Sequence, residues 1–135
     1  MARLRYTACR FYIRRRKGIN TRERGELGEK LALEFLNKKN YTTIAKGWRS
    51  RFGEIDLIVK NREYLVFVEV KLRKNANFAQ AREYVGKTKQ DKIRATANLW
   101  LATHRTQLQP RFDVIEIYAP DDVKEPAIIH IENAF

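Results

Sequence analysis

The chain has 135 residues, enough for one continuous hydrophobic core and too few for two independent ones. Its 28 Lys and Arg outnumber its 16 Asp and Glu, and the net charge of +12 favours a polyanionic partner, nucleic acid above all. One cysteine excludes an intrachain disulfide, and two distant histidines do not support a zinc site of the Cys/His type. With no secretory signal and no membrane-length apolar run, we expect a cytoplasmic protein without a membrane partner.

Basic residues concentrate at the start of the chain. Residues 1–24 contain nine of them against one acid, a net +8, and we predict a basic N-terminal arm over residues 1–20 ahead of one domain at 21–135. Such an arm would contact phosphates independently of base sequence, and the alternative is a disordered solubilising tail. The residues expected to bind nucleic acid are Arg14, Arg15, Arg16 and Lys17 in the arm, and Arg49, Arg51, Arg73 and Lys74 in the domain.

The first element of the domain is a helix. Leu27, Leu31 and Phe35 recur every four residues, which predicts a helix over residues 21–39, and Asn40 is placed to end it. Glu29 lies at the border of the apolar stripe rather than on its outer face. We therefore expect the Glu29 carboxylate to face a cleft.

Three strand-like segments follow, at residues 41–48, 52–60 and 64–71, and they predict an antiparallel meander. The third begins with an apolar run on both faces, as expected of a central strand covered on both sides. That strand nevertheless ends in Glu69-Val70-Lys71. We therefore expect the functional residues at the strand ends, where charged residues replace apolar ones.

The last third of the domain continues the alternation of helix and strand. A helical period spans residues 88–102, with Gln90 inside its apolar stripe, and residues 78–85 are a candidate further helical turn. Residues 111–118 and 127–132 are predicted strands. The expected fold is α/β, a mixed central sheet flanked by helices in the order α-β-β-β-α-β, with the C-terminal strand at the sheet edge.

Glu69 and Lys71 stand out because strand alternation places both side chains on the face of Leu65 and Phe67, which is expected to be buried. Burying unpaired charges costs several kcal/mol, so the presence of two charged residues on this face needs an explanation. A structural ion pair, or a strand end emerging into water, is one alternative. The other adds Asp56 from the neighbouring strand, so that two carboxylates and one lysine converge at the end of a sheet.

Two carboxylates that leave room for waters and a substrate phosphate match the preference of Mg²⁺, or Mn²⁺, for oxygen ligands. We predict Asp56 and Glu69 as metal ligands, with Lys71 orienting or helping to deprotonate the attacking water. Glu29 would position a second water or metal. Glu54 is either a further ligand or a solvent-facing rim acid.

Four segments carry a family resemblance: GELGEKLA at 25–32, GEIDLI at 53–58, VFVEVK at 66–71 and RFDVI at 111–115. Together they resemble the YraN family of predicted bacterial endonucleases, over about residues 21–118. The resemblance implies a restriction-endonuclease-like fold of the PD-(D/E)xK superfamily, similar to archaeal Holliday-junction resolvases, and suggests a homodimer. By this resemblance the catalytic residues are Glu29, Asp56, Glu69 and Lys71, supported by Gln90.

The chain departs from the superfamily pattern at two places. Ile55 precedes Asp56 where the superfamily name has proline, as is usual in this family, and Ala79 follows Phe78 where a glycine is expected. The arm before residue 21 lies outside the resemblance. These departures leave the acid-acid-Glu-x-Lys set intact.

The function expected from these patterns is magnesium-dependent hydrolysis of phosphodiester bonds in structured or branched DNA. One alternative is a non-catalytic nucleic-acid-binding module on the same fold, and another is an assembly protein in which the charges merely pair. The pattern does not distinguish DNA from RNA, or one metal from two. Trp48, Trp100 and Asp113 are expected to have structural roles.

Overall fold

The computed structural model describes residues 3–5, 20–73, 85–119 and 126–135. The predicted order of two helices and five strands is confirmed from residue 21 onward, and the candidate helical turn at 78–85 lies, except for Val85, outside the described residues. No helix in the described part of the chain is long and apolar enough to cross a bilayer. In chain order the elements are β1 (Arg3–Arg5), α1 (Thr21–Lys38), β2 (Thr42–Ser50), β3 (Gly53–Lys60), β4 (Tyr64–Arg73), α3 (Lys87–Thr103), β5 (Gln109–Tyr118) and β6 (Ala127–Ile131).

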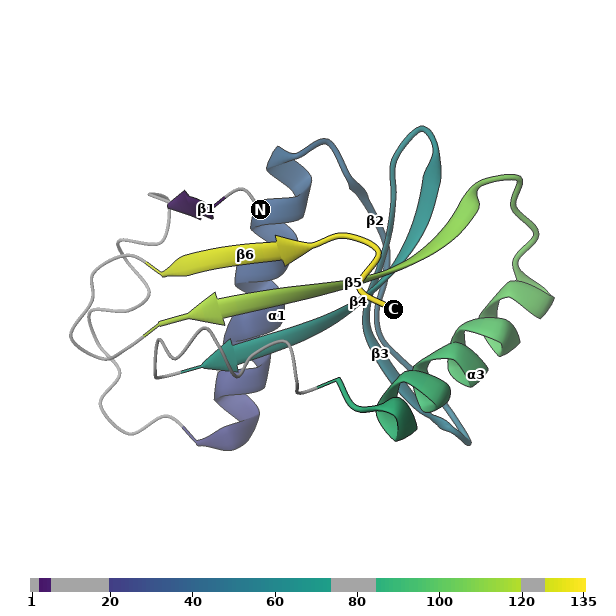
Figure 1. The fold of residues 1–135 in the computed structure, drawn as a ribbon, viewed down its shortest axis with the longest axis horizontal. Coiled ribbons are helices and arrows are strands. Elements are labelled where there is room, and N and C mark those ends of the chain that lie inside the picture. Colours follow the sequence, from purple (N-terminus) through teal and green to yellow (C-terminus); the bar gives the residue numbers. More distant parts are fainter. Residues whose placement is uncertain (1–2, 6–19, 74–84, 120–125) are drawn as a thin grey trace.

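The strands that the structure describes form one mixed sheet in the order β1-β6-β5-β4-β3-β2. Only the central pair β4 and β5 is parallel, since the chain crosses from one to the other through α3, and the remaining described pairs are antiparallel. Helices α1 and α3 pack on opposite faces (Figure 1). The chain is therefore an α/β domain with a mixed sheet between two helical layers.

The expectation that the C-terminal strand forms the sheet edge is wrong. Strand β1, which belongs to the predicted arm, pairs antiparallel with β6, and Arg3 lies opposite Ile129. An edge strand exposes unpaired backbone N–H and C=O groups, and three arm residues satisfy some of those of β6. A run of only three residues with two arginines has no strand-like pattern, so this pairing could not be predicted from the sequence.

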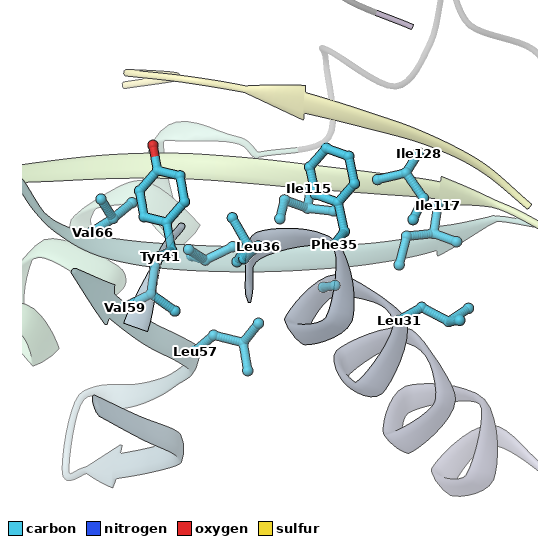
Figure 2. Close-up of a cluster of buried hydrophobic side chains, with 12 residues drawn as sticks. Leu31, Phe35, Leu36, Tyr41, Leu57, Val59, Val66, Ile115, Ile117 and Ile128 are labelled. Atoms are coloured by element: carbon cyan, nitrogen blue, oxygen red, sulfur yellow. The ribbon is translucent and has the colours of Figure 1, made fainter. Parts of the chain in front are cut away.

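Helix α1 covers one face of the sheet. Its first turn is closed by a capping box, in which the Asn20 side chain accepts from the Glu23 N–H at 2.9 Å and Glu23 Oε2 accepts from the Asn20 N–H at 3.1 Å. Asn40 adopts φ 65° just after the helix, a left-handed conformation that asparagine tolerates. Leu31 and Phe35 point from α1 into a buried apolar cluster with side chains of the sheet (Figure 2).

Helix α3 covers the other face. Ile93, Ala97 and Trp100 follow its helical period and are buried against sheet residues that include Ile58 and Phe67. The Trp100 and Phe67 rings meet edge to face, with centroids 6.0 Å apart. Trp48 is partly buried against the same cluster, so both tryptophans are core aromatics as predicted.

The sheet forks between β3 and β4. Their pairing runs from Lys60–Leu65 to Leu57–Val68 and ends there. Beyond that rung, β3 continues to pair with β2 down to Gly53, while β4 continues with β5 to its last residue. The two halves of the sheet part at this point (Figure 1). Asp56 and Glu69 are the first residues past the last rung, so the fork positions both carboxylates.

Candidate active site

Asp56 and Glu69 enter the fork from opposite strands on the same face of the sheet. Side chains alternate along a strand, and Ile58 and Phe67, each two residues away, pack in the cluster beneath α3. The two carboxylates therefore face the N-terminal half of α3. Lys71, two residues beyond Glu69 on β4, shares this face.

Asp56 is held by the backbone at the point where the ladder ends. Its Oδ2 accepts a hydrogen bond from the Val70 N–H at 2.8 Å, which fixes the carboxylate against β4. Burial raises the pKa of Asp56 to about 7, and the negative charges of Glu69 and Glu29 act in the same direction. The Val70 N–H and the positive charge of Lys89 oppose the rise. A cation bound here would therefore compete with a proton near neutral pH.

Glu69 is almost completely buried, with 5% of its side chain exposed. Its Oε1 lies 3.0 Å from Lys71 Nζ and 3.3 Å from Lys89 Nζ. Its Oε2 is buried without a hydrogen-bond partner among the described residues. Burying a carboxylate oxygen without a hydrogen-bond partner costs free energy. A cation or a water bound in the fork would provide that partner.

Glu29 approaches from α1 on the other side of the sheet. The side chain is half-buried, and burial raises the pKa of Glu29, with Glu54 and Glu26 adding to the rise and Lys46 opposing it. Its charge reaches Asp56 through the fork. Within the described residues, however, no three His, Cys, Asp or Glu side chains are placed to hold one metal ion. The structure thus brings Asp56, Glu69 and Lys71 together and leaves Glu29 at the margin.

Helix α3 contributes a different residue from the expected one. The Gln90 amide donates to the Val85 carbonyl at 2.8 Å, so it secures the segment entering the helix rather than the carboxylates. Lys89 is the α3 side chain that reaches Glu69. Lys89 stands one helical turn before the buried Ile93, and that spacing is the signal by which the sequence could have indicated it.

A second buried acid lies beside the site. Glu116 on β5 is paired in register with Lys71 on β4, so in this parallel rung the two side chains share a face. Glu116 Oε2 accepts from the Tyr118 hydroxyl at 3.0 Å, and Oε1 is buried without a partner among the described residues. Sequence reasoning missed Glu116, because nothing in β5 alone distinguishes this acid until the β4–β5 pairing is known.

The residues expected to bind nucleic acid are only partly described. Arg14, Arg15, Arg16, Lys17 and Lys74 lie outside the described residues. Arg49 and Arg51 are exposed at the hairpin between β2 and β3, where Arg49 pairs with Glu54 at 3.1 Å, and Arg73 is half-buried at the end of β4. Glu54 is thus a solvent-facing rim acid.

Asp113, which the sequence placed outside the catalytic set, is the centre of a separate polar cluster on the α1 face. Both oxygens accept from the Arg111 guanidinium at 2.8 Å, and Oδ1 also accepts from the Asn133 N–H at 2.9 Å. The Lys39 ammonium lies 3.0 Å from Nδ1 of His130 and can only donate, so that imidazole carries its proton on Nε2 and donates it to Asp113 at 2.6 Å. The cluster joins the end of α1 to β5 and β6.

The family model and the similar proteins identify the same family. The model of the uncharacterised protein family UPF0102 matches residues 28–117. A UPF0102 protein of Caldanaerobacter subterraneus subsp. tengcongensis is 41% identical over 121 residues, covering 88% of this chain and 99% of the relative. Relatives bearing the same family name occur in Acetivibrio thermocellus, 40% identical with 86% and 93% covered, and in Clostridioides difficile, 39% identical with 87% and 100% covered. The matched region contains α1 from Gly28 onward and the whole fork.

Proposed function

We propose a function for this chain, which belongs to the uncharacterised protein family UPF0102: metal-dependent hydrolysis of phosphodiester bonds in structured or branched DNA. The observation that carries the proposal is the convergence of Asp56, Glu69 and Lys71 at the fork, with one Glu69 oxygen that is buried and has no hydrogen-bond partner in the described part of the chain. We also propose that the fold is restriction-endonuclease-like and that this family is the YraN family of endonucleases.

The donor set fits Mg²⁺ or Mn²⁺. Magnesium is held in many sites by one or two carboxylates, with waters and substrate phosphate supplying the other ligands. Asp56 and Glu69 would hold the ion, and Glu69 Oε2, which no described residue hydrogen-bonds, is an oxygen available to it. Bound there, the ion would lower the pKa of a water and neutralise charge developing on the phosphate.

The chain's own groups have defined parts in this scheme. The Val70 N–H orients Asp56, and Lys71 is held beside Glu69, where its ammonium can orient the attacking water or neutralise the phosphate. Lys89 adds a second positive charge from α3. In the reaction the water oxygen adds to phosphorus, one P–O ester bond breaks, and the departing oxygen takes up a proton.

One observation favours a second candidate, a non-catalytic nucleic-acid-binding module. Glu69 Oε1 already lies within ion-pair distance of two lysines, which is also the arrangement of a structural charge cluster. In this alternative the basic surface binds nucleic acid and the fork only holds the sheet halves in place. The two candidates agree on binding and differ on cleavage.

Cleavage is tested with the purified full chain on end-labelled four-way, flap, single-stranded and linear duplex DNA, in Mg²⁺, Mn²⁺ or EDTA. We expect strand cleavage of the branched substrates with either metal and none in EDTA. Binding of all substrates without cleavage of any, in both metals, would replace the nuclease with the binding module. Cleavage that persists in EDTA would contradict the metal site.

A further inference from the structure

The hairpin that joins β2 to β3 ends in a two-residue turn, Arg51 and Phe52, and exposes an aromatic ring. Phe52 is 41% exposed and Ile44 is 39% exposed, and these are the exposed large hydrophobic residues of the described chain. Ile44 lies within β2, on the free edge of the described sheet, whereas Phe52 stands at the very tip. A single exposed hydrophobic residue does not by itself indicate a partner, so the inference depends on how the turn that carries Phe52 is held and on the charges around its ring.

The tip is anchored rather than loose. Ser50 Oγ accepts from the Phe52 N–H at 3.0 Å and lies 3.0 Å from Oγ1 of Thr96, a buried residue of α3. Gly53 has φ +150°, a conformation that residues with side chains rarely adopt, and a Cβ built there would lie 3.8 Å from Lys92 Cβ and Thr96 Oγ1. The turn therefore rests on α3, and the backbone that carries Phe52 is held before a ligand arrives, which lowers the entropic cost of binding.

The charges around the ring indicate the chemistry of the partner. The Arg51 guanidinium carbon lies 4.8 Å from the centroid of the Phe52 ring, and Arg51 is exposed. Lys92 is exposed on α3 next to Gly53. Glu54 is the acid nearest in sequence, and it is paired with Arg49. An apolar ring set among positive charges complements a nucleotide, which has a base to stack and a phosphate to pair.

The tip is also rigidly linked to the fork. Strand β3 runs without interruption from Gly53 past Asp56. Phe52 precedes Asp56 by four residues, which corresponds to about 13 Å of extended strand. That length is about four nucleotide steps along one strand of B-DNA. A base stacked on Phe52 would therefore belong to the same short stretch of DNA as a phosphate at the fork.

We propose that Phe52, flanked by Arg51, is a stacking wedge for an unpaired or partly unstacked base at a DNA branch point. The inference rests on the proposed function and supplies its substrate class, because base pairs inside a linear duplex offer no free face to a ring at a hairpin tip. Stacking on an aromatic side chain tolerates any base, so the wedge recognises the branch and not its sequence.

The test measures DNA binding by the full chain in EDTA, where no cleavage interferes. Four-way and flap substrates carry 2-aminopurine at the branch, and linear duplex of the same length is the reference. We expect Phe52→Ala to weaken binding to branched DNA by about 5- to 150-fold, with little change for duplex, and to remove the 2-aminopurine fluorescence change. The matched control Ile44→Ala and the aromatic variant Phe52→Trp should behave like the wild type.

Three outcomes would overturn the wedge: unchanged binding by Phe52→Ala, equal losses on branched and duplex DNA, or conversion of a dimer into a monomer on size-exclusion chromatography with light scattering. RNA versions of the four-way and flap substrates are measured alongside, and a loss of binding by Phe52→Ala on these alone would overturn the assignment to DNA. Because the assay needs no metal, it is independent of cleavage. Wedge binding with no cleavage in metal would leave this inference standing and reject the nuclease.

Discussion

Glu69→Gln is expected to reduce the rate of metal-dependent cleavage by at least about 100-fold, the scale seen when one charge-stabilising group is removed from an active site. Glutamine keeps the size of the side chain but removes the charge that would face the metal. The fold should survive, because Lys71 and Lys89 are 26% and 40% exposed and can be solvated without their partner. Single-turnover rates on a labelled four-way junction give the measurement.

The control for charge is Asp91→Asn on α3. Asp91 is an exposed acid that pairs with Lys87 at 3.4 Å and faces solvent near the site, so the variant loses the same charge without touching the fork. It should cleave at the wild-type rate. In EDTA, Glu69→Gln should bind DNA at least as tightly as the wild type, because one negative charge is gone. Wild-type cleavage by Glu69→Gln would remove Glu69 from the chemistry.

Asp113→Asn is expected to lower the free energy of unfolding at pH 7 by about 3–5 kcal/mol, because it removes the buried counter-charge of the Arg111 guanidinium and leaves, among the described residues, only the half-exposed Glu132 nearby. Asp113 is fully buried, and its oxygens accept four hydrogen bonds from Arg111, His130 and the Asn133 N–H. Urea denaturation checks the value. Glu132→Gln is the matched control: Glu132 is half exposed and 3.8 Å from Arg111, so its loss should cost less than about 1 kcal/mol.

The same comparison has a defined dependence on pH. Burial raises the pKa of Asp113, but hydrogen bonds from His130, Arg111 and Asn133 outweigh it and hold the pKa below the ordinary 3.8. A carboxylate whose pKa is lower in the folded state stabilises the fold above its unfolded pKa, and loses that contribution as pH falls through the folded pKa. The difference between wild type and Asp113→Asn should therefore be constant above about pH 5 and shrink in acid. A difference that persists in acid would mean that shape, and not charge, is responsible.

The features predictable from the sequence were those set by local periodicity. The four-residue spacing of Leu27, Leu31 and Phe35 indicated α1, and strand alternation assigned Glu69 to a buried face together with Phe67. Both patterns depend on neighbours within one element, so no tertiary information is needed to read them.

The features that sequence reasoning missed depend on contacts between elements. The spacing of Lys89 from Ile93 places it near the buried side of α3, but its ion pair with Glu69 becomes visible only when the helix is packed on the sheet. The position of Glu116 beside the site follows from its parallel pairing with Lys71. The fork arises because β3 keeps its pairing with β2 while β4 keeps its pairing with β5. The register between two strands cannot be predicted from the sequence of either strand alone. For the same reason Phe52 was predicted to begin a strand, whereas it lies in the hairpin turn that rests on α3.

Asp56 distinguishes an active site from a structural charge cluster. Burial and the charges of Glu69 and Glu29 raise the pKa of Asp56 from 3.8 to about 7. A carboxyl group whose pKa is higher in the folded state does not destabilise the fold at a pH below its unfolded pKa. As the pH rises above that value the folded protein loses stability, and the loss is complete above the folded pKa. The metal-free protein should therefore lose stability between about pH 4 and pH 7 on account of this residue, and Asp56→Asn should not.

The measurement that tests the account most directly is urea denaturation of the wild type and Asp56→Asn at pH 8, each with and without millimolar Mg²⁺. Without metal, Asp56→Asn should be the more stable protein, by about 1–3 kcal/mol, because the ionisation cost is removed. Added Mg²⁺ should stabilise the wild type by RT ln(1 + [L]/Kd) and leave Asp56→Asn nearly unchanged. If Asp56 instead belongs to a structural ion pair, Asp56→Asn will lose about 3–5 kcal/mol whether or not Mg²⁺ is present, and that result would contradict the metal site.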